Sequence, residues 1–415
     1  MLFKYKAKNP EGETREGETE AASQLDLARA LRDEGFYLID VEVMGDDGEN
    51  SGSGVQKLAK LDLNVFVEKI KGVSLEEKMM FSRNLSVMIS SGIDISRALE
   101  VLEKQSQSPT FKRTIKKISK DLQSGKNFSD AVAEHPKIFG TLYSSMVKAG
   151  EVSGNLDGTL EVLASQLEKQ HELRSKVRGA MVYPAVIIIA MIGIGILMMI
   201  MVVPQLKSIF GDLGVDLPVT TQAIITVSDF LTVYWWAVLA ALPFFIFLLK
   251  KFLSTENGKR SLSFLVLHIP LFKELSHKIN NAAFARTLSS LISGGVPILE
   301  GLGIVSETLN NVYYRESLES ATEEVKKGKN LYEVLDGYSK LYTPLMLEMI
   351  QVGEESGKLS DLLSRVAEFY EREVSDTTDN MSSIIEPILM LFIGGAVGFF
   401  AISIMQPIYG MLGSA

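Results

Sequence analysis

A long segment of this chain is present twice. Residues 81–204 align without a gap on residues 284–407 at a constant offset of 203, and both copies contain Gly-Glu-x-Ser-Gly-x-Leu, at 150–156 and at 353–359. Self-similarity at a fixed offset indicates duplicated structural units. Any fold must therefore accommodate two equivalent units. The recurring positions of most interest are Arg83, Gly92, Gly150, Glu151, Gly154, Leu156 and Pro184 in the first copy and Arg286, Gly295, Gly353, Glu354, Gly357, Leu359 and Pro387 in the second.

Three stretches of the chain are almost free of charge. They cover residues 180–203, 230–249 and 384–411, and Glu386 is the only charged residue in the last of them. A hydrocarbon core about 30 Å thick is crossed by about 20 helical residues. The sequence therefore predicts three transmembrane helices, and with them a lipid bilayer as a partner of the chain.

The first 44 residues predict a small β/α domain. Residues 3–8 alternate apolar and lysine side chains, residues 9–12 have turn chemistry, and residues 14–19 predict a second short strand. A helical pattern at 21–35 and a strand pattern at 36–43 follow. Residues 45–72 are expected to be a linker, since their first part is rich in Gly, Ser and acidic residues.

Residues 73–179 and 250–383 predict two helical bundles of about six helices each, because strand patterns are absent. The first bundle begins with a capping box, in which Ser74 precedes Glu77 by three residues. Its helices are expected to break at Gly92, Pro109, Gly125, Pro136 and Gly150. The last helix, from about Leu156, enters the first span without a linker, which would couple the bundle mechanically to the membrane.

The distribution of basic residues predicts the orientation in the membrane. Basic side chains precede the first span and follow the second, whereas residues 204–229 contain one basic residue, Lys207. An excess of Lys and Arg marks the cytoplasmic side. Both bundles and the N-terminus are then cytoplasmic, and 204–229 is an extracytoplasmic loop. Two copies in the same orientation need one returning crossing between them, and only residues 230–249 can provide it.

Composition excludes several classes of function. The chain has no cysteine, and its four histidines are scattered without a metal-ligand spacing, so we expect no metal site. A net charge of −9 argues against nucleic acid as a partner. The glycines of the repeated motif do not form a phosphate-binding loop, because Leu359 stands where that motif requires Ser or Thr. We expect neither catalytic residues nor a cofactor.

The repeated motif has two readings. The structural one is a tight turn between two helices, in which glycines supply unusual backbone angles and Ser153 or Ser356 lies near the next helix start. The functional one is a partner surface to which Glu151 or Glu354 contributes a free carboxylate. Both readings remain open on the sequence.

Two features of the third span are also candidates. Glu386 is an acid within an apolar run, which points either to a functional site or to a side chain that reaches the interface. An inward-facing carboxylate there would guide a positively charged group of a membrane-embedded client. Gly394 and Gly398 have a Gly-x-x-x-Gly spacing, which suits close helix packing either within one subunit or between two.

These features resemble the type II secretion F-domain family. Phe81-x-Arg83-x-Leu85 and Phe284-x-Arg286-x-Leu288 are similar to that family's opening motif in both copies, and Glu386-Pro387 is similar to a motif of its second span. The Tyr5-Lys-Ala-Lys8 segment, with Gly12 and Glu16-Gly-Glu18, is similar to its N-terminal domain. The resemblance covers essentially the whole chain.

The resemblance implies a non-enzymatic platform in the bacterial inner membrane. Such a platform would receive force from a cytoplasmic hexameric ATPase and pass pilin or pseudopilin subunits into a growing filament, together with other inner-membrane assembly proteins and as a homo-oligomer. A membrane-anchored scaffold or receptor without a motor partner fits the same topology. A transporter fits less well, because most of each repeat is soluble.

Overall fold

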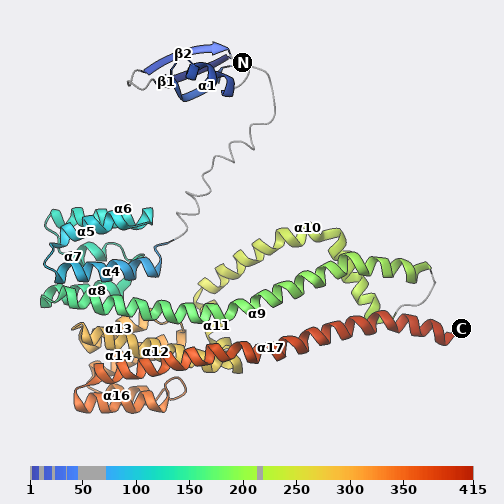
Figure 1. Ribbon diagram of the computed structural model, residues 1–415. Helices are drawn as coiled ribbons and strands as arrows, with labels where there is room; N and C mark the ends of the chain where they lie inside the picture. Colours follow the sequence, from blue (N-terminus) through green and yellow to red (C-terminus); the bar gives the residue numbers. More distant parts are fainter. Residues whose placement is uncertain are drawn as a thin grey trace. The chain divides into compact units, whose positions relative to one another are not determined.

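The computed structural model describes residues 2–8, 14–20, 24–33, 35–44, 72–212 and 218–414 (Figure 1). Almost all of the predicted linker lies outside these residues. The chain divides into two compact units, residues 1–70 and 71–415, and each is described by itself.

The described residues of the first unit form a three-stranded antiparallel sheet and one helix. Its elements are β1 (Leu2–Lys8), β2 (Thr14–Glu20), α1 (Gln24–Asp33) and β3 (Tyr37–Met44), and the strand order is β2-β1-β3. Alternation along β1 puts Tyr5 and Ala7 on one face, where they are buried with Leu27 and Leu31 of α1. A Cβ at Gly17 would lie 3.0 Å from the Tyr5 hydroxyl, so this glycine leaves room for the ring.

The second unit begins with the helices of the first repeat. Ser74 caps the first of them by accepting a hydrogen bond from the Glu77 amide at 3.0 Å, as the sequence predicts. Pro109 stands at the start of a helix, where its missing N–H costs nothing. The helices are α4 (Leu75–Ser90), α5 (Ile95–Gln105), α6 (Pro109–Gln123), α7 (Phe128–Ala133), α8 (Gly140–Ser153) and α9 (Leu156–Asp212).

The second repeat forms the same succession of helices. Its helices are α12 (Pro270–Ser293), α13 (Ile298–Thr308), α14 (Val312–Lys326), α15 (Leu331–Asp336), α16 (Pro344–Ser356) and α17 (Leu359–Ser414). The glycines that end equivalent helices have nearly identical φ angles, +81° at Gly92 and +83° at Gly295. Gly150 does not break a helix as predicted, because α8 continues to Ser153 and ends at Gly154, where φ is +69°.

The two repeats share one hydrophobic core. Buried residues from Phe81 to Tyr370 form a single cluster that spans both copies. At its centre the buried amide of Gln166 donates to Thr287 at 3.2 Å and accepts from Ser290 at 2.9 Å, which satisfies both ends of the amide. The bundles therefore pack as one body, with α9 against α12 and α17.

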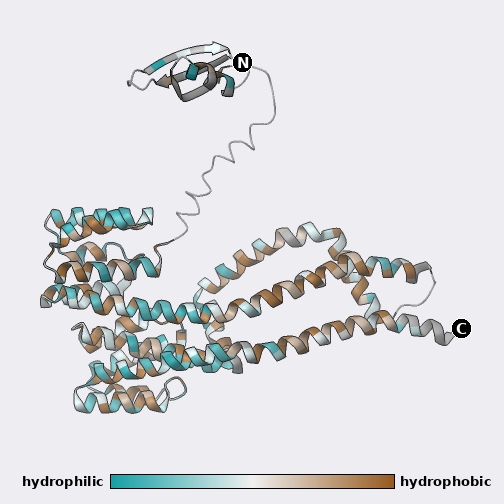
Figure 2. Ribbon diagram, in the orientation of Figure 1, coloured by the Kyte–Doolittle hydropathy of each residue, from teal (hydrophilic) through white to brown (hydrophobic). Residues whose placement is uncertain are grey.

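Two long helices extend from this body. In Figure 1, α9 and α17 leave the bundles in the same direction, and Figure 2 shows that their distal parts are largely apolar. Near the bundles they pack on each other and on α12 through a second cluster, with Val177 of α9, Leu275 of α12 and Met381 of α17 among its members. Within the described residues, both helices are long and apolar enough to cross a membrane.

The helix between the repeats is bent. Helix α10 (Val219–Ser254) turns by 78° between its parts Val219–Ala237 and Ala240–Ser254, and Tyr234 has non-helical backbone angles. Up to three spans can be counted among the described residues if this bent pair acts as one. The prediction of a loop at 204–229 is mostly wrong, since α9 continues to Asp212 and α10 begins at Val219. Helix α11 (Glu256–His268) follows.

Candidate functional site: the repeated motif and the paired long helices

The repeated glycines allow a tight crossing between consecutive helices. A Cβ at Gly150 would lie 2.5 Å from the Thr159 hydroxyl oxygen, and one at Gly353 would lie 2.9 Å from the Leu359 Cα. Neither distance is compatible with a side chain, so α8 and α16 can approach α9 and α17 only where glycine is present. Gly154 and Gly357, both with φ of +69°, then turn the chain into the long helices.

The glutamates of the motif have the same structural role in both copies. Glu151 accepts hydrogen bonds from the amides of Phe128 and Ser129 at 2.7 and 3.0 Å, at the start of α7. Glu354 makes the equivalent bonds, also at 2.7 and 3.0 Å, at the start of α15. A carboxylate satisfies unpaired N–H groups there and interacts favourably with the helix dipole.

These bonds revise the reading of the motif. The carboxylates, which one of the two interpretations left free for a partner, accept hydrogen bonds inside the fold. The serines lie near the start of the next helix, but their hydroxyls bond to the helix that they end. Ser153 and Ser356 are the last residues of α8 and α16, and their hydroxyls donate back to the carbonyls of Gly150 and Val352. The motif therefore forms the close crossing and tight turn between two consecutive helices, and its glutamate caps a third. Leu156 and Leu359 are the first residues of the long helices.

The repeated arginines tie each bundle to its long helix. Arg83 of α4 pairs with Glu168 of α9 at 2.9 Å, and hydrogen bonding to this guanidinium lowers the pKa of the Glu168 carboxyl. Arg286 of α12 binds both oxygens of Glu371 of α17 at 2.8 Å. The sequence marks both arginines through the repeat. Their partners lie 85 residues further along the chain, and Glu168 and Glu371 also occupy equivalent positions of the repeat, so the offset marks both members of each pair but not that they meet.

Each bundle also contains an aromatic trio, of which the sequence motifs include only one member each, Phe81 and Phe284. Phe81, Phe111 and Phe139 pack with ring centroids 5.3–6.0 Å apart in the first copy. Phe284, Tyr314 and Tyr342 occupy the equivalent positions in the second, in edge-to-face contacts of 5.5 Å. Alignment at the 203-residue offset would have found them, since an aromatic ring is present at all six positions.

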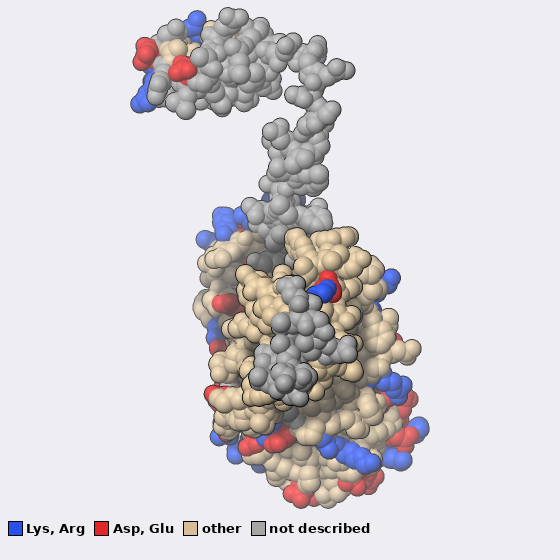
Figure 3. All heavy atoms as spheres, turned by 90° about the vertical axis from the view of Figure 1, so that its right-hand side faces the viewer, with Lys and Arg blue, Asp and Glu red and all other residues tan. Residues whose placement is uncertain are grey.

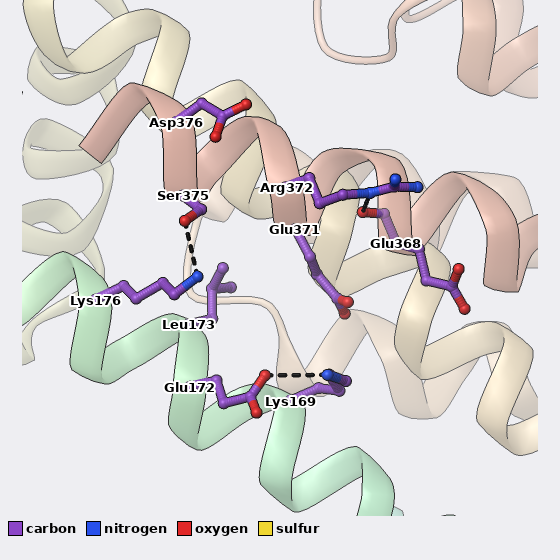
Figure 4. Close-up of a pocket in the computed structure, with 9 residues that line it drawn as sticks. All are labelled: Lys169, Glu172, Leu173, Lys176, Glu368, Glu371, Arg372, Ser375 and Asp376. Carbon is purple, nitrogen blue, oxygen red and sulfur yellow. Dashed lines mark hydrogen bonds and ion pairs between the residues drawn. The ribbon is translucent and has the colours of Figure 1, made fainter. Parts of the chain in front are cut away.

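A charged crevice lies between the two long helices just before their apolar parts. Its volume is about 390 Å³, and Figure 4 shows α9 side chains facing those of α17 across it. Lys176 donates to the Ser375 hydroxyl across the crevice at 2.7 Å, whereas Lys169 pairs with Glu172 on its own helix at 3.0 Å. Of these two contacts, only the Lys176–Ser375 bond joins the helices. No described group of three or more acidic or histidine side chains could hold a metal ion.

The apolar parts of the helices contain the remaining candidates. Pro184 is buried within α9, whereas Glu386 and Pro387 of α17 are exposed on the isolated chain. No described atom lies within 4 Å of a Cβ built on Gly394 or Gly398, so their predicted packing within the subunit does not occur in the part of the chain that the structure describes. Viewed from the distal end, the near surface is mostly uncharged, and charged side chains gather around the bundles behind it (Figure 3).

Comparison with known proteins places these features in a family. The model described as "Type II secretion system (T2SS), protein F" matches residues 81–204 and 284–407, the two copies of the repeat. The model of the N-terminal domain of the same protein matches residues 1–42. Together the matches cover well over half of the chain.

Curated relatives match over nearly their whole length. "Type IV pilus assembly protein PilC" of Thermus thermophilus is 34% identical over 413 residues, which cover 100% of this chain and 98% of the relative. "Type II secretion system protein F" of Aeromonas hydrophila is 32% identical over 392 residues, covering 94% and 97%. The chain therefore belongs to the type II secretion system protein F family, the inner-membrane platform proteins of type IV pilus and type II secretion systems.

Proposed function

We propose that this protein is a non-enzymatic platform in the bacterial inner membrane that transmits the movement of a cytoplasmic hexameric ATPase to pilin or pseudopilin subunits entering a filament. The chemistry would come from the ATPase. The observation that carries the proposal is the continuity of α9 and α17, each of which runs from the shared core into an apolar segment without a break. A continuous helix transmits a displacement of its base to its membrane part.

The shared core also supports the proposed topology. Two bundles with one hydrophobic core must lie on the same side of the bilayer, and α9 leaves that side. Helix α10 must then return through the membrane before α11 and α12 join the core, which gives three crossings in spite of the bend. With the basic residues at the bundle side, the bundles and the N-terminus are cytoplasmic.

Exposed features of the apolar part suggest where partners bind. Glu386 is exposed near the start of the α17 span, where an anionic group would attract a cationic group of a pilin subunit. Gly394 and Gly398 remain free for close packing against a second copy, which supports a homo-oligomer. Replacement of Glu386 by Gln should reduce filament assembly with unchanged protein level, and full assembly would refute this part of the proposal.

The continuity of α9 can be tested by breaking it. Insertion of four glycines after Arg178 should leave the bundles folded and the protein in the membrane, while filament assembly is lost. The control is the same insertion after Gly54, in the predicted linker, which should leave assembly intact. Normal filaments from the first variant would overturn the proposed force transmission.

A second measurement separates the platform from a scaffold without a motor. The full chain, purified from membranes, should copurify with the assembly ATPase encoded by the same organism, and the complex should form equally well with the glycine insertion, since binding does not require a rigid α9. Retention of other assembly proteins without the ATPase would favour the scaffold reading.

A further inference from the structure

The junction of α10 and α11 has a fixed geometry. Thr255 joins the helices: its amide donates to the Phe252 carbonyl at 3.0 Å, and its hydroxyl oxygen caps α11 by accepting from the Gly258 amide at 3.2 Å. A Cβ at Gly258 would lie 2.0 Å from the Phe252 carbonyl oxygen, so glycine is required for this close approach. This junction, called the α10–α11 elbow below, therefore holds the start of α11 against the end of α10.

The inner face of α11 packs on the second bundle. Gly258, Ser263 and Leu267 are buried, and the Ser263 hydroxyl oxygen accepts a hydrogen bond from the Val312 amide at the start of α14. Through this contact the bundle, the elbow and the apolar part of α10 form one connected structure. The position of α11 is therefore fixed relative to the end of α10 and to the second bundle.

The outer face of the elbow is apolar and exposed. Phe252, Leu262, Phe264 and Leu265 are each 45–53% exposed, although large apolar side chains are normally covered. A groove of about 770 Å³ runs between the end of α10 and α11, and it is lined by all four of these side chains together with Leu249 at the end of the apolar stretch. The exposed surface is therefore continuous with the part of α10 proposed to cross the bilayer.

Basic residues surround this apolar surface. Residues 250–268 contain four Lys or Arg residues and one acid, Glu256. Glu256 pairs with Lys259 at 3.1 Å, and Arg260 pairs with Glu316 at 3.3 Å. Lys250 and Lys251 are exposed beside the groove and leave the elbow with an excess of positive charge. An apolar surface with a basic rim is typical of helices that lie in the headgroup region of anionic membranes.

We propose that the α10–α11 elbow, defined by Lys250, Lys251, Phe252, Leu262, Phe264 and Leu265, is a docking surface for anionic phospholipids of the leaflet that faces the bundles. The apolar side chains insert between the upper acyl chains, and the two lysines contact headgroup phosphates. The elbow lies outside the repeated segment 284–407, so this anchor is specific to the second half of the molecule. The proposal rests on the proposed membrane crossing of α10.

Because the native chain has no cysteine, a single introduced cysteine can be labelled without background. Leu265→Cys is labelled with an environment-sensitive fluorophore in the full chain, reconstituted in vesicles of phosphatidylcholine and phosphatidylglycerol whose acyl chains are brominated near the headgroup. Quenching at Leu265 is expected. Phe244→Cys in the apolar part of α10 should be quenched by bromines deep in the chain, and Val152→Cys on the first bundle should not be quenched.

The three labelled sites test separately whether α10 crosses the bilayer and whether the elbow contacts lipid. Quenching at Phe244 without quenching at Leu265 would overturn the elbow proposal and leave the crossing intact. No quenching at Phe244 would overturn the crossing, and with it the proposed topology. Disulfide cross-linking of Leu265→Cys between two copies, with no lipid quenching, would identify the elbow as a subunit interface instead.

The role of charge is tested by comparing brominated phosphatidylglycerol with brominated phosphatidylcholine. Preference for the anionic lipid at Leu265 should fall by up to roughly fivefold for each of Lys250→Gln and Lys251→Gln, because a basic residue near an anionic surface contributes on the order of a fivefold preference. Lys148→Gln on α8 is the matched control and should change nothing. Equal preference in all variants would overturn the assignment to anionic lipid.

Discussion

The two copies of the repeat have the same backbone and different interiors. The ends of most helices, the angles of the glycines present in both copies and the glutamate caps coincide at the 203-residue offset, although α12 begins eight residues before the equivalent of the α4 start. In the first copy, however, Lys78 donates to the Ile138 carbonyl at 2.9 Å, and burial lowers the pKa of this ammonium group. In the second copy the equivalent carbonyl, of Leu341, accepts from Asn281 and from the Tyr314 hydroxyl.

The aromatic trios follow the same division. The phenylalanines of the first copy need no polar partner. The hydroxyls of Tyr314 and Tyr342 are buried in the second copy, and Leu341, Asn281 and Ser317 provide their hydrogen bonds. Burial raises the pKa of both tyrosines, so they stay neutral hydrogen-bonding groups. The comparison teaches that the two copies share their turns and helix caps, whereas the buried polar groups and their hydrogen-bond partners differ between the two cores.

The largest difference between the copies should come from the arginine pairs. The side chains of Arg286 and Glu371 are 15% and 17% exposed, whereas those of Arg83 and Glu168 are both 36% exposed. Arg286→Met should lower the free energy of unfolding by about 3 kcal/mol, because it leaves a carboxylate buried without its partner. Arg83→Met should cost less than about 1 kcal/mol. Thermal unfolding of the full chain in detergent measures both, with exposed Arg365→Met as the control; equal losses would refute this ranking.

Replacing the glycine at each helix crossing, Gly150 or Gly353, by alanine should lower the free energy of unfolding by a similar amount in both copies. Gly150→Ala and Gly353→Ala should each cost about 2 kcal/mol, because the added Cβ forces two helices apart. Gly303→Ala in α13 is the control, since its Cβ would meet no atom within 4 Å and helix propensity favours alanine by about 1 kcal/mol. A large loss in only one copy would show that the crossing is not equivalent in the two.

Exchanging one aromatic residue between the copies should show that the interiors differ. Phe111→Tyr places a hydroxyl beside the Ile138 carbonyl, which already accepts from Lys78, and should cost about 2 kcal/mol because the added oxygen overpacks an apolar core. The reverse change, Tyr314→Phe, removes hydrogen bonds and should cost about 1 kcal/mol. Both are read from thermal unfolding. If Phe111→Tyr leaves the free energy of unfolding unchanged, the first core can also provide a hydrogen-bond partner for a hydroxyl.

Removal of either glutamate cap should destabilise the start of one short helix, and the loss of stability should be the same in the two copies. Glu151→Ala and Glu354→Ala should each cost about 1.5 kcal/mol, because two amides at the start of α7 or α15 lose their acceptor. Hydrogen exchange should accelerate at Phe128 and Ser129 in the first variant and at Leu331 and Tyr332 in the second. Unchanged exchange at these amides would contradict the capping role.

The smallest effect should be a pH dependence of the exposed arginine pair. The pKa of Glu168 is lowered from 4.5 by Arg83, so its stabilising contribution is present above that value and is lost as pH falls through the lowered pKa. The stability difference between the native chain and Arg83→Met should therefore be constant above about pH 5 and shrink below 4.5. A difference that grows on acidification would have the wrong sign.

Local signals determined much of this protein without tertiary information. The repeat, the capping box at Ser74, the helical periodicity of the bundles and the continuity of Leu156 into an apolar stretch can be read from neighbouring residues, because caps and periodicity act over a few positions. The same reasoning placed breaks at Gly92 and Gly125 correctly, where φ is positive.

Only the tertiary structure decided what the repeated residues do. Glu151 and Glu354 looked free because the amides that donate to their carboxylates lie 22 and 23 residues away. Gly150 looked like a helix end because its role depends on how closely α8 crosses Thr159 of α9. The shared core and the pairing of each arginine with its glutamate likewise depend on which surfaces meet. Such contacts join residues far apart along the chain, and a pattern of neighbouring residues does not encode their distances.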